Sequence, residues 1–87
     1  MVQPAERIRD FLIDEAHWDG TRADLTDDLP LIESHVIDSM LLLRLVAWLE
    51  SEYGIVIGDA DVVPSNFGSI EWIGRLVATK LAPADGM

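Results

Sequence analysis

The sequence contains no cysteine, and it has only 6 lysines and arginines against 16 aspartates and glutamates. Without cysteine the chain can form neither a disulfide nor a thiolate zinc site. Its formal net charge of -10 repels nucleic acid and anionic membrane surfaces. We therefore expect neither nucleic acid nor membrane as a partner, and we expect proteins with basic patches instead.

Long apolar runs are also missing. No stretch reaches the roughly 18 apolar residues of a membrane span. The opening "MVQPAERIRD" is polar and lacks the apolar centre of a signal peptide. A cytoplasmic protein is therefore expected. The 87 residues suffice for a single domain, 1–87, with a core over about 4–81 and a flexible tail over 82–87.

Apolar residues at helical spacing predict three main helices. The first covers residues 4–18, and the second covers residues 39–53 and is closed by Gly54. The third covers residues 70–81, and Ser69 can cap its start. We expect a bundle because each helix carries an apolar face that needs covering.

Between the first two helices lies a connection of about twenty residues, Asp19–Asp38. It is rich in turn residues but also contains leucines and isoleucines, so we expect it to fold back onto the core. Further on, residues 57–69, "IGDADVVPSNFGS", predict a short extra helix. The run "YGIVI" is strand-like but cannot form a sheet alone. The predicted fold is all-α: a small bundle of three main helices plus a short extra helix, with a long first loop.

The predicted helix over residues 39–53 is apolar on two sides. One side is a core stripe of Leu42, Leu45, Val46, Leu49 and Tyr53. The other side, where a surface helix usually carries charge, holds Met40, Leu41, Arg44, Ala47 and Trp48. Either the first loop or the last helix covers this side, or it is an exposed patch on which another protein docks.

A serine, Ser39, lies at the N-terminus of this predicted helix, directly after Asp38. As a nucleophile Ser39 would need partners such as His35, but the G-x-S-x-G elbow is missing, and catalytic triads are assembled in space from separate elements. As a helix cap, the Asp-Ser pair is ordinary. The third role is an attachment site for another group, beside a docking surface.

A metal site is not expected. The stretch "GDADVVPSNFGSI" begins like a calcium loop, but Pro64 and Ile70 occupy the positions that need glycine and glutamate. The two histidines, His17 and His35, lack the helical spacing of a zinc pair. The acids of this stretch are better explained as solvated surface residues.

Three stretches, "LPLIESHVIDSM", "LRLVAWLESEYGI" and "VVPSNFGSIEWIGRLV", resemble the acyl and peptidyl carrier proteins over about residues 25–81. The most specific element is Asp38-Ser39-Met40, because an Asp-Ser pair followed by leucine or methionine opens the second helix in this family. His35 stands near a position where many members have glycine. The apolar "LRLVAWL" looks more like peptidyl than fatty-acid carriers, and the chain resembles free-standing members.

The resemblance implies that Ser39 is esterified by 4'-phosphopantetheine from coenzyme A, with Asp38 assisting recognition by a phosphopantetheinyl transferase. It implies no enzyme, but a monomeric carrier of aminoacyl or acyl thioesters in nonribosomal peptide or polyketide-type biosynthesis. An adenylating or acyl-loading enzyme and downstream condensing or tailoring enzymes would be its partners. They would dock on Met40, Leu41, Arg44, Ala47 and Trp48. The alternative is an unmodified helical interaction module, a degenerate carrier in which Ser39 is only a helix cap.

Overall fold

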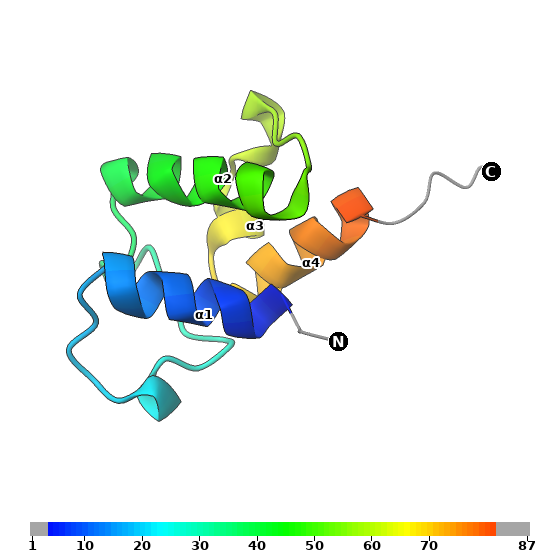
Figure 1. Cartoon of the computed structure of the whole chain (residues 1–87). Coiled ribbons are helices and arrows are strands. Elements are labelled where there is room, and N and C mark those ends of the chain that lie inside the picture. The colour runs from blue at the N-terminus through cyan, green and yellow to red at the C-terminus, as the bar shows by residue number, and fades with distance from the viewer. Residues whose placement is uncertain (1–3, 82–87) are drawn as a thin grey trace.

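The computed structural model describes residues 4–81, and these residues are all-α, as predicted. The bundle is built from α1 (Pro4–Glu15), α2 (Ser39–Tyr53) and α4 (Ile70–Leu81). A single turn, α3 (Pro64–Phe67), is the predicted extra helix. Figure 1 shows α1 and α2 running side by side in opposite directions, with α3 and α4 completing the bundle. Within residues 4–81 no helix is long and apolar enough to cross a bilayer, and the predicted tail, 82–87, lies outside the described residues.

The first helix is shorter than predicted. α1 ends at Glu15 instead of continuing to residue 18, because His17 has a φ of 54° and turns the chain out of the helix. This left-handed conformation is common for glycine at a helix end and uncommon for histidine. Gly20 is the glycine that follows this helix in the sequence, and no local signal marks His17, so the earlier end was missed.

One hydrophobic core joins every helix. The centre of the α2 contribution is the row Leu41, Leu45 and Leu49, spaced four residues apart on one face. The remaining buried apolar residues are Ile8, Leu12, Leu25, Leu31, Ile37, Ile55, Ile57, Phe67, Ile70, Ile73, Leu76 and Val77. Three of these belong to the long first loop, so the loop is part of the core, as predicted.

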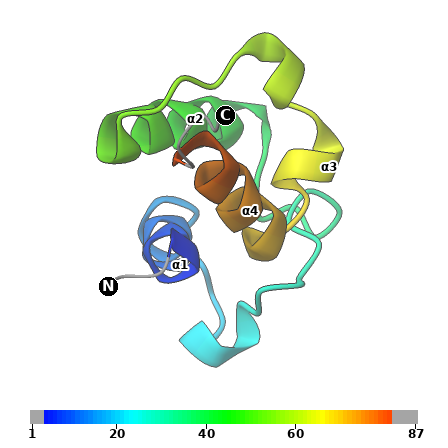
Figure 2. The same ribbon diagram turned by 90° about the vertical axis from the view of Figure 1, so that its right-hand side faces the viewer.

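The long loop, residues 16–38, is also tied to the far side of the bundle by backbone hydrogen bonds. The N–H of Leu31 donates to the carbonyl oxygen of Gly68 across 2.8 Å, and the N–H of Glu71 donates to that of Asp27 across 2.9 Å. The loop therefore closes the start of α4 and meets the end of α3. Figure 2 shows it passing below α1 and then rising beside α3 and α4 before it enters α2. Two short 3-10 turns complete the connections: η1 (Arg22–Asp24), which was not predicted, lies in this loop, and η2 (Asp59–Asp61) lies in the stretch after α2 where a short turn or helical turn was expected.

A buried arginine fastens the loop to α1. Arg9 is only 8% exposed, and its Nε donates to the carbonyl oxygen of Leu25 across 2.9 Å. Its guanidinium also pairs with Glu6 and Asp27. Hydrogen bonds from Arg22 and from Arg9 lower the pKa of Glu6 below its ordinary value. The loop is thus held by both apolar burial and a charge cluster.

Candidate functional site

The site begins where the loop enters α2. Asp38 has extended backbone angles, and its carboxylate accepts a hydrogen bond from the N–H of Leu41 across 2.8 Å. Asp38 is therefore the N-cap of the helix, and Ser39 is its first helical residue. The reading of Ser39 as the helix cap is wrong. The exposed Ser39 side chain is not needed to satisfy the start of α2.

The turn before Asp38 holds this end of the helix in place. The N–H groups of Val36 and Ile37 both donate to the carbonyl oxygen of Leu31, and the N–H of Ser34 donates to that of Pro30. Ile37 is buried in the core directly before the cap. The buried Ile37 side chain and the backbone hydrogen bonds of the turn thus fix the position of Ser39 on the surface.

The electrostatic potential at the N-terminus of α2 favours a negatively charged phosphodiester on Ser39. α2 is 15 residues long and has no acid in its first turn, so its N-terminal N–H groups and its dipole favour an added negative charge. The Asp38 carboxylate next to Ser39 offsets part of this effect, while the exposure of Ser39 leaves room for a bulky group. The residues present therefore fit the phosphate of phosphopantetheine.

A hydrolytic triad is not assembled here. The Asp38 carboxylate accepts the N–H of Leu41, and within residues 4–81 it has no hydrogen bond to a histidine. Among the hydrogen bonds within residues 4–81, none joins Ser39 to His35. His35 itself is exposed and has a φ of 60°, the left-handed region that favours glycine. A histidine thus occupies a conformation that glycine would adopt at lower cost, near a position where many members of the resembled family have glycine.

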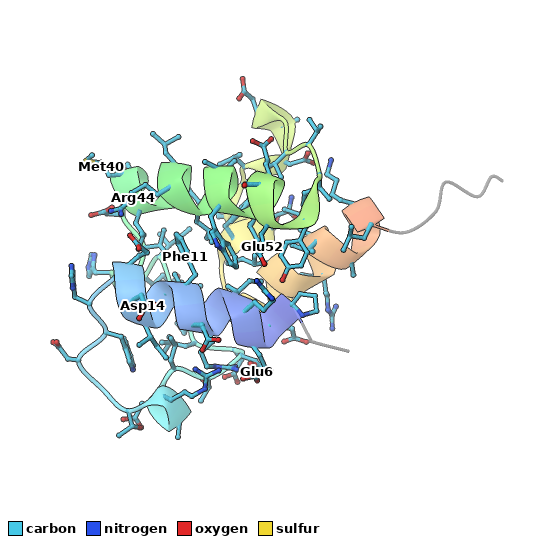
Figure 3. The ribbon with its side chains drawn as sticks, viewed as in Figure 1. Glu6, Phe11, Asp14, Met40, Arg44 and Glu52 are labelled. Carbon is cyan, nitrogen blue, oxygen red and sulfur yellow. The ribbon has the colours of Figure 1, made fainter. Side chains whose placement is uncertain are left out.

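The predicted docking residues on α2 divide into two groups. Met40, which is 73% exposed, lies on the surface together with Arg44 and Ala47. Leu41 is only 7% exposed and belongs to the core, so its predicted docking role is wrong. Leu43, which is not among the predicted docking residues, is 70% exposed. We call Met40, Leu43, Arg44 and Ala47 the outer face of α2; Figure 3 labels Met40 and Arg44 near the start of the helix.

Trp48 packs in the junction between α1 and α2. It is half-buried, its ring stacks on that of Phe11 with centroids 4.8 Å apart, and it meets Tyr53 edge-on at 6.2 Å. Ion pairs lie on both sides of this junction, between Arg7 and Glu52 and between Arg44 and Glu15. Only part of Trp48 is left for a docking partner. Burial also raises the pKa of the Tyr53 hydroxyl.

Three curated relatives of the chain are carriers by name. Aminoacyl carrier protein 1 of Bradyrhizobium diazoefficiens is 34% identical over 62 residues, which is 71% of this chain and 68% of the relative. The probable acyl carrier protein PigG of a Serratia species is 32% identical over 59 residues, 68% of either chain. Polyketide-8 synthase acyl carrier protein 2 of Streptomyces avermitilis is 29% identical over 76 residues, 87% of this chain and 83% of the relative.

The solved structure of KstB-PCP in its apo form matches with a TM-score of 0.78 at 37% identity, covering 93% of this chain and 89% of that one. No protein-family model matches the sequence. With this fold, an exposed serine at the start of α2 and these relatives, the chain belongs to the acyl carrier protein family in the broad sense that includes aminoacyl and peptidyl carriers. It is a carrier and not an enzyme.

Proposed function

We propose that Ser39 carries 4'-phosphopantetheine and that the chain shuttles aminoacyl or acyl thioesters between the enzymes of a nonribosomal peptide or polyketide-type pathway. The observation that carries the proposal is the exposed Ser39 at the start of α2, where Asp38 has already taken the capping role. When attached, the group supplies the terminal thiol that the cysteine-free chain lacks.

The chain's own residues have three tasks in this function. The Ser39 oxygen gives up its proton and forms a phosphate ester with the phosphopantetheine of coenzyme A, while the pyrophosphate bond of coenzyme A breaks and 3',5'-adenosine bisphosphate leaves. The first-turn N–H groups of α2 stabilise the added negative charge. Asp38 fixes the start of the helix and presents its exposed carboxylate beside Ser39, where the transferase recognises it.

Partner enzymes dock on the outer face of α2. Met40 and Leu43 are exposed apolar side chains within two turns of Ser39, and Arg44 and Ala47 continue the same surface. A partner bound there would receive the cargo from an arm tethered next to its contact, which raises the local concentration of the cargo. The loading enzyme, adenylating or acyl-transferring, and the condensing or tailoring enzymes would use this surface in turn.

The relatives support both kinds of cargo. One is named for aminoacyl groups and another for a polyketide synthase. We keep aminoacyl and acyl thioesters together because the choice is made by the loading enzyme and not by a pocket at Ser39.

The test is the intact mass of the protein after incubation with coenzyme A and a broad-specificity phosphopantetheinyl transferase. One phosphopantetheine should add to the parent and to Ser51→Ala, which alters another exposed serine of α2, and none to Ser39→Ala. If the folded parent gains nothing while the same transferase modifies another carrier, the chain is an unmodified interaction module. Addition to Ser39→Ala would place the modification elsewhere.

A further inference from the structure

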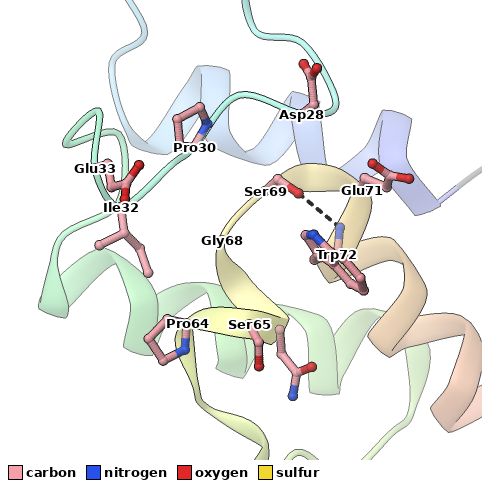
Figure 4. A pocket seen from close by; sticks show the side chains of 11 residues that line it. Asp28, Pro30, Ile32, Glu33, Pro64, Ser65, Gly68, Ser69, Glu71 and Trp72 are labelled. Carbon is pink, nitrogen blue, oxygen red and sulfur yellow. Dashed lines mark hydrogen bonds between the residues drawn. The ribbon is translucent and has the colours of Figure 1, made fainter.

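A groove lies between the long loop, α3 and α4, and its lining residues come from these three segments and the short Gly68–Ser69 connection, not from the outer face of α2. Its volume is about 650 Å³, within the range of sites that bind ligands or side chains. Figure 4 shows Ile32, Pro30 and Pro64 around the opening and Trp72 of α4 at its side. The groove therefore offers a second apolar surface, separate from the docking face of the proposed function.

Trp72 is the largest side chain of the groove, and it is held in place although it is exposed. It is 47% exposed, and the guanidinium of Arg75 stacks over its ring at 4.7 Å. The N–H of Trp72 donates to the Ser69 hydroxyl across 3.2 Å, which fixes the first turn of α4. An exposed indole offers a large apolar contact, and tryptophan is enriched among the residues that dominate binding at interfaces.

Three acids border this apolar surface: Asp28, Glu33 and Glu71. Glu71 pairs with Arg75, which lies outside the lining, and Asp28 accepts only the hydroxyl of Thr26. Glu33 is exposed and forms no ion pair within residues 4–81. The groove thus keeps a negative charge that its own neighbours do not neutralise, beside an apolar wall.

The lysines and arginines of the chain already have acidic partners of their own. The chain has 6 lysines and arginines, and all of them lie within the described residues and form internal ion pairs. They are Arg7, Arg9, Arg22, Arg44, Arg75 and Lys80. A second copy could offer a lysine or arginine only by opening one of these pairs, which favours a different protein as the source of the complementary side chain.

We propose that this groove binds a segment of a partner protein in which a lysine or arginine adjoins a large apolar side chain. The cation would lie against Asp28 and Glu33, and the apolar side chain against Trp72 and Ile32. Attraction between opposite charges speeds and orients docking, while the buried apolar contact sets the lifetime of the complex. The inference goes beyond the carrier function and does not depend on modification of Ser39.

The probe is a capped peptide that alternates arginine and leucine, titrated into the isotope-labelled full chain and followed by NMR. It should bind saturably and shift the backbone amides of residues 28–33 and 65–72 and the indole N–H of Trp72. Two comparison peptides replace arginine with glutamate or leucine with serine, and both should bind more weakly. If the peptide with serine in place of leucine bound as tightly as the arginine–leucine peptide, binding would depend on charge alone and the proposal would be overturned.

Matched variants test the two contacts separately. Trp72→Ala should weaken binding about tenfold, while Val56→Ala, at another exposed apolar residue, should leave it unchanged. Glu33→Gln should weaken binding about threefold, while Asp14→Asn, which removes the same charge from α1, should not. Equal losses in the controls, shifts centred on Met40 and Leu43, or no saturable binding would each overturn the proposal.

Discussion

The carboxylate of Asp38 accepts the N–H of Leu41 across 2.8 Å, so α2 is capped by the residue immediately before Ser39. One side chain therefore combines an observed structural role with the proposed role in transferase recognition. The two roles can be separated because serine is also a good N-cap residue but carries no charge.

Asp38→Ala should lower the free energy of unfolding by about 1 kcal/mol through loss of the cap, and Asp38→Ser should recover most of it. Urea denaturation measures both. If the carboxylate also aids the transferase, Asp38→Ser should accept phosphopantetheine more slowly although its helix is capped. Modification of Asp38→Ser at the parent's rate would limit Asp38 to capping.

Neighbouring residues of α2 should respond very differently to truncation. Leu41→Ala should cost about 3 kcal/mol because it opens a cavity in the core. Met40→Ala and Leu43→Ala should change the free energy of unfolding by less than about 0.5 kcal/mol, since both side chains are exposed. Thermal or chemical denaturation of the three variants checks this. A stable Leu41→Ala protein would contradict the assignment of Leu41 to the core.

Charge on the outer face of α2 should impair docking without unfolding the domain. Met40→Glu and Leu43→Glu should slow phosphopantetheine transfer at a fixed transferase concentration, because an apolar contact is replaced by a hydrated charge. Circular dichroism should show unchanged helicity. Val56→Glu is the matched control, since Val56 is equally exposed but lies after α2. Parent-like rates for both α2 variants would move the docking surface elsewhere.

The ring stack between α1 and α2 should be energetically coupled. Phe11 and Trp48 lie 4.8 Å apart with an interplanar angle of 26°, and such pairs contribute about 1 kcal/mol beyond burial. A double-mutant cycle with Phe11→Leu and Trp48→Leu, read by denaturation, should give a coupling energy near this value. Additive losses would mean that the rings only fill space.

Acid should remove one contact at the end of α4. Lys80 lies 2.7 Å from Asp61, and its hydrogen bond, with that of the Gly58 N–H, lowers the pKa of Asp61 below the ordinary value of 3.8. The folded state thus binds this proton less tightly than the unfolded state. The resulting stabilisation is present above pH 3.8 and is lost as the pH falls through the lower pKa of the folded protein. Asp61→Asn should therefore be less stable than the parent at neutral pH, and the difference should shrink in acid; a constant difference would contradict this ion-pair account.

Both bounds of α2 and the start of α4 could be predicted from local signals, because Asp38 caps α2, Gly54 ends it and Ser69 caps α4. Which face of α2 is buried in the core could not be predicted from the sequence. Its segment "LLLRLVAWL" has so few polar residues that a helical wheel has no charged face to set against a core. The buried row falls on Leu41, Leu45 and Leu49, which puts Leu41 inside and Leu43 outside.

In the long loop, too, some features could be predicted from nearby residues and others depend on contacts with distant parts of the chain. Its leucines predicted that it would pack on the core, and Leu25 and Leu31 do so. Nothing local indicated that Arg9 would be buried against it, because that contact needs a carbonyl and a carboxylate brought from another part of the chain. The groove beside Trp72 was missed for the same reason, since it exists only where loop, α3 and α4 meet.

The bonds from Leu31 to Gly68 and from Glu71 to Asp27 clamp the loop that leads to Ser39. On the proposed function, the attachment point is then a fixed pivot, and all reach must come from the tether itself. The two hydrogen bonds oppose unwinding of the loop, so the domain itself adds little to that reach. Each partner enzyme must therefore have its reacting centre within one tether length of the place where the domain docks. The length of the tether thus sets the same maximum distance between docking surface and reacting centre in every partner.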